Sequence, residues 1–114
     1  MRDLVVVLTT MPDDRRSDEL AEAIVGERLA ACVNVIGPVT STYRWKGAVE
    51  RETERQLVMK TTRDRLTALE ARVRALHPYE LPEFVVLTVE VASAGYAAWV
   101  TEQTRTDPGD TPAP

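Results

Sequence analysis

The sequence of 114 residues predicts one α+β domain with the element order β-α-β-β-α-β and a short helix after it. Three observations lead to this prediction. Apolar residues alternate or run together in some stretches, as in strands, and recur every three or four residues in two others, as in helices. A long hairpin lies between the two helical stretches. This order is that of the split β-α-β, ferredoxin-like fold, in which both main helices cover one face of an antiparallel sheet.

The first strand and helix lie in the N-terminal quarter of the chain. Leu4 to Leu8 is a continuous apolar run rich in valine, which predicts a strand buried on both faces. Pro12 follows it, and Asp13 and Asp14 offer oxygens for a helix N-cap. A first helix is expected from about Arg15 to Leu29, where five apolar residues recur at helical spacing: Leu20, Ala21, Ile24, Val25 and Leu29.

The central hairpin is the longest element expected. Its strands face each other across Trp45-Lys46-Gly47-Ala48, where the glycine can supply a positive φ. The return strand from Val49 to Thr61 would span about 43 Å, whereas a compact domain of this size has a radius of gyration of about 13 Å. The hairpin must therefore curl or reach another chain. Gly37-Pro38 in the first strand predicts a bulge, a bend or a free edge, because proline cannot donate to a ladder.

Two aromatic residues near the hairpin end, Tyr43 and Trp45, need cover from water. A second copy of the chain is the simplest cover, so we expect an oligomer with both residues in its interface.

The return strand begins with a polar stretch whose helix propensity is better than its strand propensity. We assign it as strand because the hairpin needs a partner of that length. Its acids alternate with arginines and predict a solvated or intersubunit ion-pair strip: Glu50, Arg51, Glu52, Glu54 and Arg55.

The second helix has the clearest helical pattern. Thr61 and Asp64 resemble a capping box, and Pro78 ends the helix at His77 because the residue before a proline disfavours helical geometry. Four apolar residues form one stripe that should face the sheet: Leu66, Leu69, Val73 and Leu76.

The C-terminal part completes the fold. His77 to Glu83 is a stiff, proline-containing connector, and Phe84 to Val91 predicts the fourth strand. Ser93 can cap a short last helix that carries Tyr96, Trp99 and Val100. We expect one domain over residues 1–104 and a disordered tail over residues 105–114, which has nothing to bury.

Composition excludes several classes of function. The net charge of −4 argues against a nucleic-acid partner, and the inner strands lack the aromatic residues of an RNA-binding sheet. The five apolar residues after the N-terminus are too few for a signal peptide or a membrane span. One cysteine permits no internal disulfide, which suits a reducing compartment. The expectation is a cytoplasmic protein without a membrane or nucleic-acid partner.

Two residues are candidate metal ligands. Cys32 is either a small buried hydrophobic residue or a soft ligand for copper or zinc. His77 either caps its helix or binds a metal, with Glu80 and Glu83 close in sequence. One cysteine and one histidine cannot close a tetrahedral site alone. Any metal site must therefore recruit carboxylates or ligands from another subunit.

Other polar residues give little sign of catalysis. No nucleophile elbow is present, and the first βα turn has no glycine to cradle a phosphate, so an enzyme is not expected. Lys60 lies near the inner end of the return strand. It is either an edge residue that extends to water or a group facing a ligand in a cleft.

Several segments, in this order, closely resemble the CutA family of divalent-cation tolerance proteins: Leu29-Ala30-Ala31-Cys32-Val33-Asn34, Thr40 to Gly47, Lys60-Thr61, His77-Pro78-Tyr79-Glu80-Leu81-Pro82-Glu83 and Tyr96-Ala97-Ala98-Trp99. The resemblance extends from Leu4 to Val100. Two positions depart from it, since Gly37-Pro38 reverses the usual order and Thr88 stands where a proline is common.

The resemblance implies a ferredoxin-like, PII-like homotrimer and tolerance of copper and other divalent metals, with no catalytic activity and no organic cofactor. The family motifs include Cys32 and His77, and with Glu80 and Glu83 they form the expected set of ligands for Cu²⁺ or another divalent cation. The alternative function is a PII-like signalling trimer. It would bind a small anionic metabolite or nucleotide in intersubunit clefts through Lys60 and Arg44.

Overall fold

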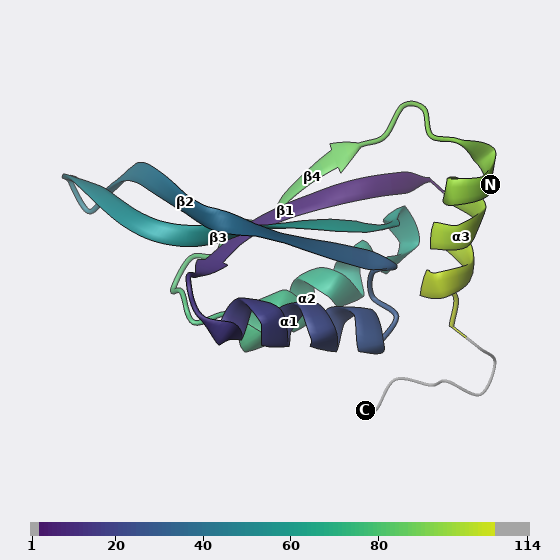
Figure 1. Cartoon of the computed structure of the whole chain (residues 1–114), viewed down its shortest axis with the longest axis horizontal. Helices are drawn as coiled ribbons and strands as arrows, with labels where there is room; N and C mark the ends of the chain where they lie inside the picture. Colours follow the sequence, from purple (N-terminus) through teal and green to yellow (C-terminus); the bar gives the residue numbers. More distant parts are fainter. Residues whose placement is uncertain (1–2, 107–114) are drawn as a thin grey trace.

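The computed structural model describes residues 3–106 and contains an antiparallel sheet with the strand order β2-β3-β1-β4 (Figure 1). Helices α1 and α2 cover one face of this sheet, and α3 lies at one end of it. The elements are β1 (Leu4–Pro12), α1 (Arg15–Gly26), β2 (Cys32–Trp45), β3 (Ala48–Thr62), η1 (Arg63–Arg65), α2 (Leu66–Leu76), β4 (Val85–Thr88) and α3 (Ala94–Thr104). This arrangement confirms the predicted split β-α-β-β-α-β fold.

Strand β1 lies between β3 and β4, and its side chains alternate between two environments. Val5, Val7 and Met11 are buried on the face that α1 and α2 cover. Leu4 and the residues that alternate with these three are only half-buried, because the described part of the chain places no helix over the opposite face. The prediction of burial on both faces is therefore wrong for the single chain. We call this opposite side of the sheet the outer face.

Helix α1 begins as predicted and ends earlier. The carboxylate of Asp14 accepts a hydrogen bond from the Arg16 backbone N–H at 2.9 Å, which caps the first turn. The helix ends at Gly26, because Arg28 adopts a left-handed conformation with φ 61°. Leu29 nevertheless reaches the core beyond the helix end.

Helix α2 follows a short 3₁₀ turn, and the predicted capping box is wrong. Thr61 is still part of β3, and its buried hydroxyl donates to the Leu29 carbonyl oxygen at 2.7 Å. Leu69 and Val73 are fully buried, as the stripe predicts. Leu76 is 40% exposed and lines a surface groove between α1 and α2. The helix ends at Leu76, with His77 in extended geometry.

The β2–β3 hairpin projects beyond the helices (Figure 1) and gives the molecule a long axis of 47 Å. Its register shifts between Ile36 and Val39, which confirms an irregularity at Gly37-Pro38. Gly37 packs closely on β3, since a Cβ there would lie 2.9 Å from Cγ of Arg55. Gly47 has φ 83° in the turn, as expected.

The C-terminal elements differ from the prediction in length. Strand β4 covers only Val85–Thr88, which pairs with Leu8 to Val5 of the longer strand β1. The hydroxyl of Ser93 accepts a hydrogen bond from the Tyr96 N–H and caps α3 as predicted. Most of the predicted tail, residues 107–114, lies outside the described residues. No helix within residues 3–106 is long and apolar enough to cross a membrane.

Candidate functional site

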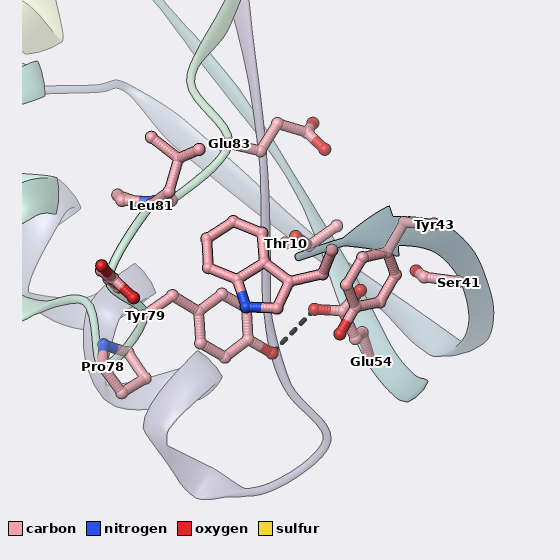
Figure 2. Close-up of a pocket in the computed structure, with 11 residues that line it drawn as sticks. Thr10, Ser41, Tyr43, Glu54, Pro78, Tyr79, Leu81 and Glu83 are labelled. Carbon is pink, nitrogen blue, oxygen red and sulfur yellow. Dashed lines mark hydrogen bonds between the residues drawn. The ribbon is translucent and has the colours of Figure 1, made fainter. Parts of the chain in front are cut away.

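A cavity of about 670 Å³ lies between the hairpin and the connector that joins α2 to β4 (Figure 2). The hairpin supplies Ser41, Tyr43, Trp45 and Glu54, and β1 supplies Thr10. The connector closes the other side with residues 78–83. This volume lies within the range of pockets that hold small molecules, about 300–1,000 Å³.

Strand alternation explains how the hairpin builds its wall. Ser41 pairs with Glu52, and Tyr43 pairs with Glu50, so these side chains share one face of the hairpin. Trp45 and Glu54 follow at the same period of two. The wall is therefore both aromatic and acidic, and burial together with the charges of Glu52, Glu50 and Glu54 raises the pKa of Tyr43.

Glu54 is the most deeply placed carboxylate of this cavity, with only 6% of the residue exposed. One of its oxygens accepts a hydrogen bond from the Tyr79 hydroxyl at 2.7 Å, as the dashed line in Figure 2 marks. Burial and the hydrogen bond to Glu54 raise the pKa of Tyr79, so its hydroxyl keeps its proton and remains the donor. This bond joins the connector to the hairpin.

His77 fixes the other end of the connector through both ring nitrogens. Nε2 lies 2.7 Å from the Thr10 carbonyl oxygen, which can only accept, so Nε2 carries a proton. Nδ1 accepts a hydrogen bond from the Tyr79 backbone N–H at 3.2 Å. The ring is thus a neutral imidazole, and burial lowers its pKa.

The structure brings only some of the predicted metal ligands together. Glu80 and Glu83 both line the cavity. Cys32 pairs with Lys60, and Lys60 pairs with Val6, whereas the His77 ring contacts Thr10, four residues further along β1. Cys32 and the His77 ring are therefore about 13 Å apart along the strand direction. Residues 3–106 contain no group of three or more His, Cys, Asp or Glu side chains placed to hold a metal ion.

The two positively charged residues expected to bind an anionic ligand, Lys60 and Arg44, lie outside this cavity. Lys60 donates a hydrogen bond to the Asn34 side-chain oxygen on the outer face. Neither Lys60 nor Arg44 lines the cavity, whose described lining holds three carboxylates and no lysine or arginine. An anionic metabolite would meet repulsion in this cavity, and neither Lys60 nor Arg44 lines it to offset that repulsion.

Sequence reasoning overlooked Glu54, Tyr79, Ser41 and Thr10 as parts of one site. A signal was present for the hairpin residues, because serine and two aromatics alternate on one strand and three glutamates alternate on the next. The alternation predicts two matched faces. It does not show which face the connector closes.

The fold and the cavity define a class: ferredoxin-like α+β proteins with a long projecting hairpin and a cavity between that hairpin and the connector from α2 to β4. Within this class, the family model described as CutA1 divalent ion tolerance protein matches residues 5–103. The chain therefore belongs to the CutA1 divalent ion tolerance family.

Individual relatives agree with this membership. The divalent-cation tolerance protein CutA of Thermus thermophilus is 44% identical over 99 residues, which are 87% of this chain and 96% of that protein. Human protein CutA is 42% identical over 96 residues, and the match covers 84% of this chain but only 54% of the human protein. The crystal structure of CutA from Xylella fastidiosa superposes with a TM-score of 0.88 at 37% identity, covering 90% of this chain and 99% of that one.

Proposed function

We propose that this protein binds divalent cations, copper among them, as a cytoplasmic homotrimer, and that it acts in cation tolerance without catalysing a reaction. The observation that carries the proposal is membership of the family over nearly the whole domain, residues 5–103. Relatives named for divalent-cation tolerance are 41–44% identical to it over 96–99 aligned residues. A single free cysteine suits the reducing cytoplasm.

The outer face of the sheet supports the oligomer. Ile36 and Leu87 lie on this face and are 49% and 48% exposed. Val85, also on β4, is a third exposed apolar side chain of this face. Exposed apolar side chains grouped on one face are typical of a protein–protein interface. The strand β2, which is an edge strand of the described sheet, offers a second surface for pairing with another subunit.

Cys32 is the better placed of the two soft ligands. It is half-buried on the outer face, where copies of the chain would meet, and the general affinity order of divalent metals places Cu²⁺ above Zn²⁺. His77 would have to give up one of its two hydrogen bonds before it could bind a metal. A site shared between subunits would use Cys32 first. The carboxylates of Glu80 and Glu83 are the ligands that the connector could add.

Calorimetric titration of the assembled protein with Cu²⁺ and Zn²⁺ tests the proposal. We expect saturable Cu²⁺ binding that is tighter than Zn²⁺ binding and that falls at least tenfold in Cys32→Ser, because the soft ligand is lost. His77→Gln should have a smaller effect. Glu70→Gln, which removes a charge from an exposed residue of α2, is the control and should leave copper binding unchanged. Equal copper affinity in the wild type and Cys32→Ser would overturn the assignment of Cys32.

A further inference from the structure

We propose that Glu54 and Arg55 are positioning residues for assembly. They fix the direction in which the β2–β3 hairpin projects, and that direction decides whether three copies of the chain fit together. The inference rests on the proposed homotrimer and goes beyond it, because it assigns control of assembly to the base of the hairpin rather than to its aromatic end. We call the contacts of these two residues the hairpin clamp.

The hairpin projects beyond the rest of the sheet (Figure 1), and the clamp lies where it leaves the sheet. Strand β3 pairs with β1 as far as Glu54, which is opposite Pro12, the last residue of β1. Within the described residues, positions 48–53 of β3 pair only with β2, so this part of the hairpin is a two-stranded ribbon. Such a ribbon has little stability of its own and twists more than a wide sheet does. Its direction is therefore set by the contacts at its base.

Arg55 ties the base of the ribbon to α1, on the face of the sheet that the helices cover. Its Nε donates to a carboxylate oxygen of Asp13 at 2.8 Å, and its Nη1 donates to oxygens of Ser17 and Asp18 at 3.3 Å each. The side chains of Arg55 and Asp13 are 30% and 33% exposed, so water and salt screen this pair less than a fully exposed one. The backbone of Gly37 lies against the aliphatic part of Arg55, where a Cβ would be 2.9 Å from Cγ. Both ends of the Arg55 side chain are therefore held.

Glu54 ties the same point to the connector on the outer face. Neighbouring residues of a strand face opposite sides of the sheet, so Glu54 and Arg55 hold the ribbon from both sides. The Glu54 carboxylate accepts the hydrogen bond of the Tyr79 hydroxyl at 2.7 Å. Tyr79 is itself fixed by His77, through its backbone N–H and through contact of the two rings. The clamp thus opposes rotation of the ribbon toward either face.

A small rotation at the clamp becomes a large displacement at the end of the hairpin. Residues 48–53 separate the clamp from the turn and span about 20 Å at roughly 3.3 Å per residue. A rotation of about 10° would move Trp45 by roughly 3–4 Å, which is close to the whole range of a packing contact. Trp45 and Tyr43 are the residues expected between copies of the chain. Arg55 therefore acts on assembly from the opposite face of the sheet.

Trimer formation requires the correct direction in three hairpins at once. The apparent affinity of a chain falls with the fraction of molecules that are competent to bind. For three chains this fraction enters as its third power, so a roughly threefold loss of correctly directed hairpins lowers the association constant of the trimer about 27-fold. Assembly is thus a sensitive measure of the clamp.

The test follows assembly of the full chain by light scattering over a dilution series. Subunit exchange between two pools labelled at the α-amino group adds the rates of association and dissociation. In Arg55→Gln we expect the association constant of the trimer to fall about tenfold or more, mainly through slower association, because assembled copies still hold each hairpin in place. Trp45→Ala removes an interface contact instead and should speed dissociation. Arg55→Lys, which keeps the charge on a single nitrogen, should recover part of the loss.

Arg16→Gln is the matched control. Arg16 forms an ion pair of the same kind with Asp14, through Nε and Nη2 at 2.8–3.2 Å, but this pair lies at the start of α1 and includes no hairpin residue. It should leave assembly unchanged. Tyr79→Phe removes the other side of the clamp and keeps the ring, so it should slow association as Arg55→Gln does. Agreement between these two variants guards against misfolding of either one as the cause.

The outcomes separate the clamp from the homotrimer. Slower association in Arg55→Gln and Tyr79→Phe, with Arg16→Gln unchanged, would support the clamp. A wild-type trimer whose association is unchanged in both variants would overturn the clamp alone. Faster dissociation at an unchanged association rate would make the two residues ordinary interface contacts and would also overturn it. A wild-type protein of single-chain mass would overturn the homotrimer and this inference together.

Discussion

His77 illustrates how one side chain can hold a loop in place. Its ring bridges the Thr10 carbonyl of β1 and the Tyr79 N–H of the connector, and it packs against the Tyr79 ring at 4.7 Å. The same residue begins the connector that closes the cavity. A protonated imidazole could not accept the Tyr79 hydrogen bond, so this arrangement requires the neutral form.

Protonation of His77 should therefore destabilise the fold at mildly acidic pH. The pKa of His77 lies below 6.5 in the folded state and near 6.5 in the unfolded chain. The unfolded state thus binds more protons, and the free energy of unfolding falls as the pH drops through about 6.5 toward the folded pKa. Urea unfolding at pH 7.5 and 5.5 measures the loss. In His77→Gln, which does not titrate, we expect a smaller loss, and equal losses would contradict this account.

The sequence predicts where His77 lies but not what it contacts. Pro78 locates the residue at the end of α2, and the helix dipole there favours a charged imidazole. Burial against β1 has the opposite effect on the pKa. The partner carbonyl belongs to Thr10, 67 residues away, and no local pattern indicates a contact at that distance. Glu54 and Tyr79 meet in the same way, through tertiary packing alone.

Among the elements, α2 gives a direct test of the apolar stripe. Leu69→Ala should cost about 2–5 kcal/mol, because it leaves a cavity beneath the sheet. Leu76→Ala should cost less than about 1 kcal/mol, since its side chain already meets water in the groove beside Arg72. Chemical denaturation of both variants measures the difference. Similar losses at the two positions would mean that Leu76 is covered in solution.

Element type was predictable where periodicity is strong, and element ends were not. The alternation in β2 and the helical spacing in α1 and α2 follow from the chain itself. The end of β4 depends on which residues of β1 it pairs with, which is a property of the sheet. The end of α1 depends on the left-handed Arg28, and arginine is not a residue type that signals such geometry.

The shape of the whole molecule leads to a prediction about assembly. A hairpin that extends beyond its own core and an apolar outer face are both better covered by further copies of the chain. Light scattering at low micromolar concentration should give the mass of three chains. Trp45→Ala should weaken assembly by roughly 2 kcal/mol or more, about thirtyfold in the dissociation constant, as for a central aromatic residue in an interface.

Arg15→Ala is a suitable control for that experiment, because its side chain is 91% exposed on α1. It should leave the mass unchanged. A wild-type protein of single-chain mass would contradict the homotrimer, while membership of the family would stand on the fold and the comparisons.

The order of strands in the sheet also has a consequence for biosynthesis. Strand β1 lies between β3 and β4, so within the described residues the strand that is made earliest is flanked by the two that are made last. The β2–β3 hairpin can close locally as soon as Thr62 has emerged, but β1 keeps one edge open until Val85–Thr88 is translated. Non-local pairing of this kind is slow and leaves strand edges exposed. The nascent chain therefore exposes at least one unpaired edge of β1 from the time that strand is made until Val85–Thr88 has followed.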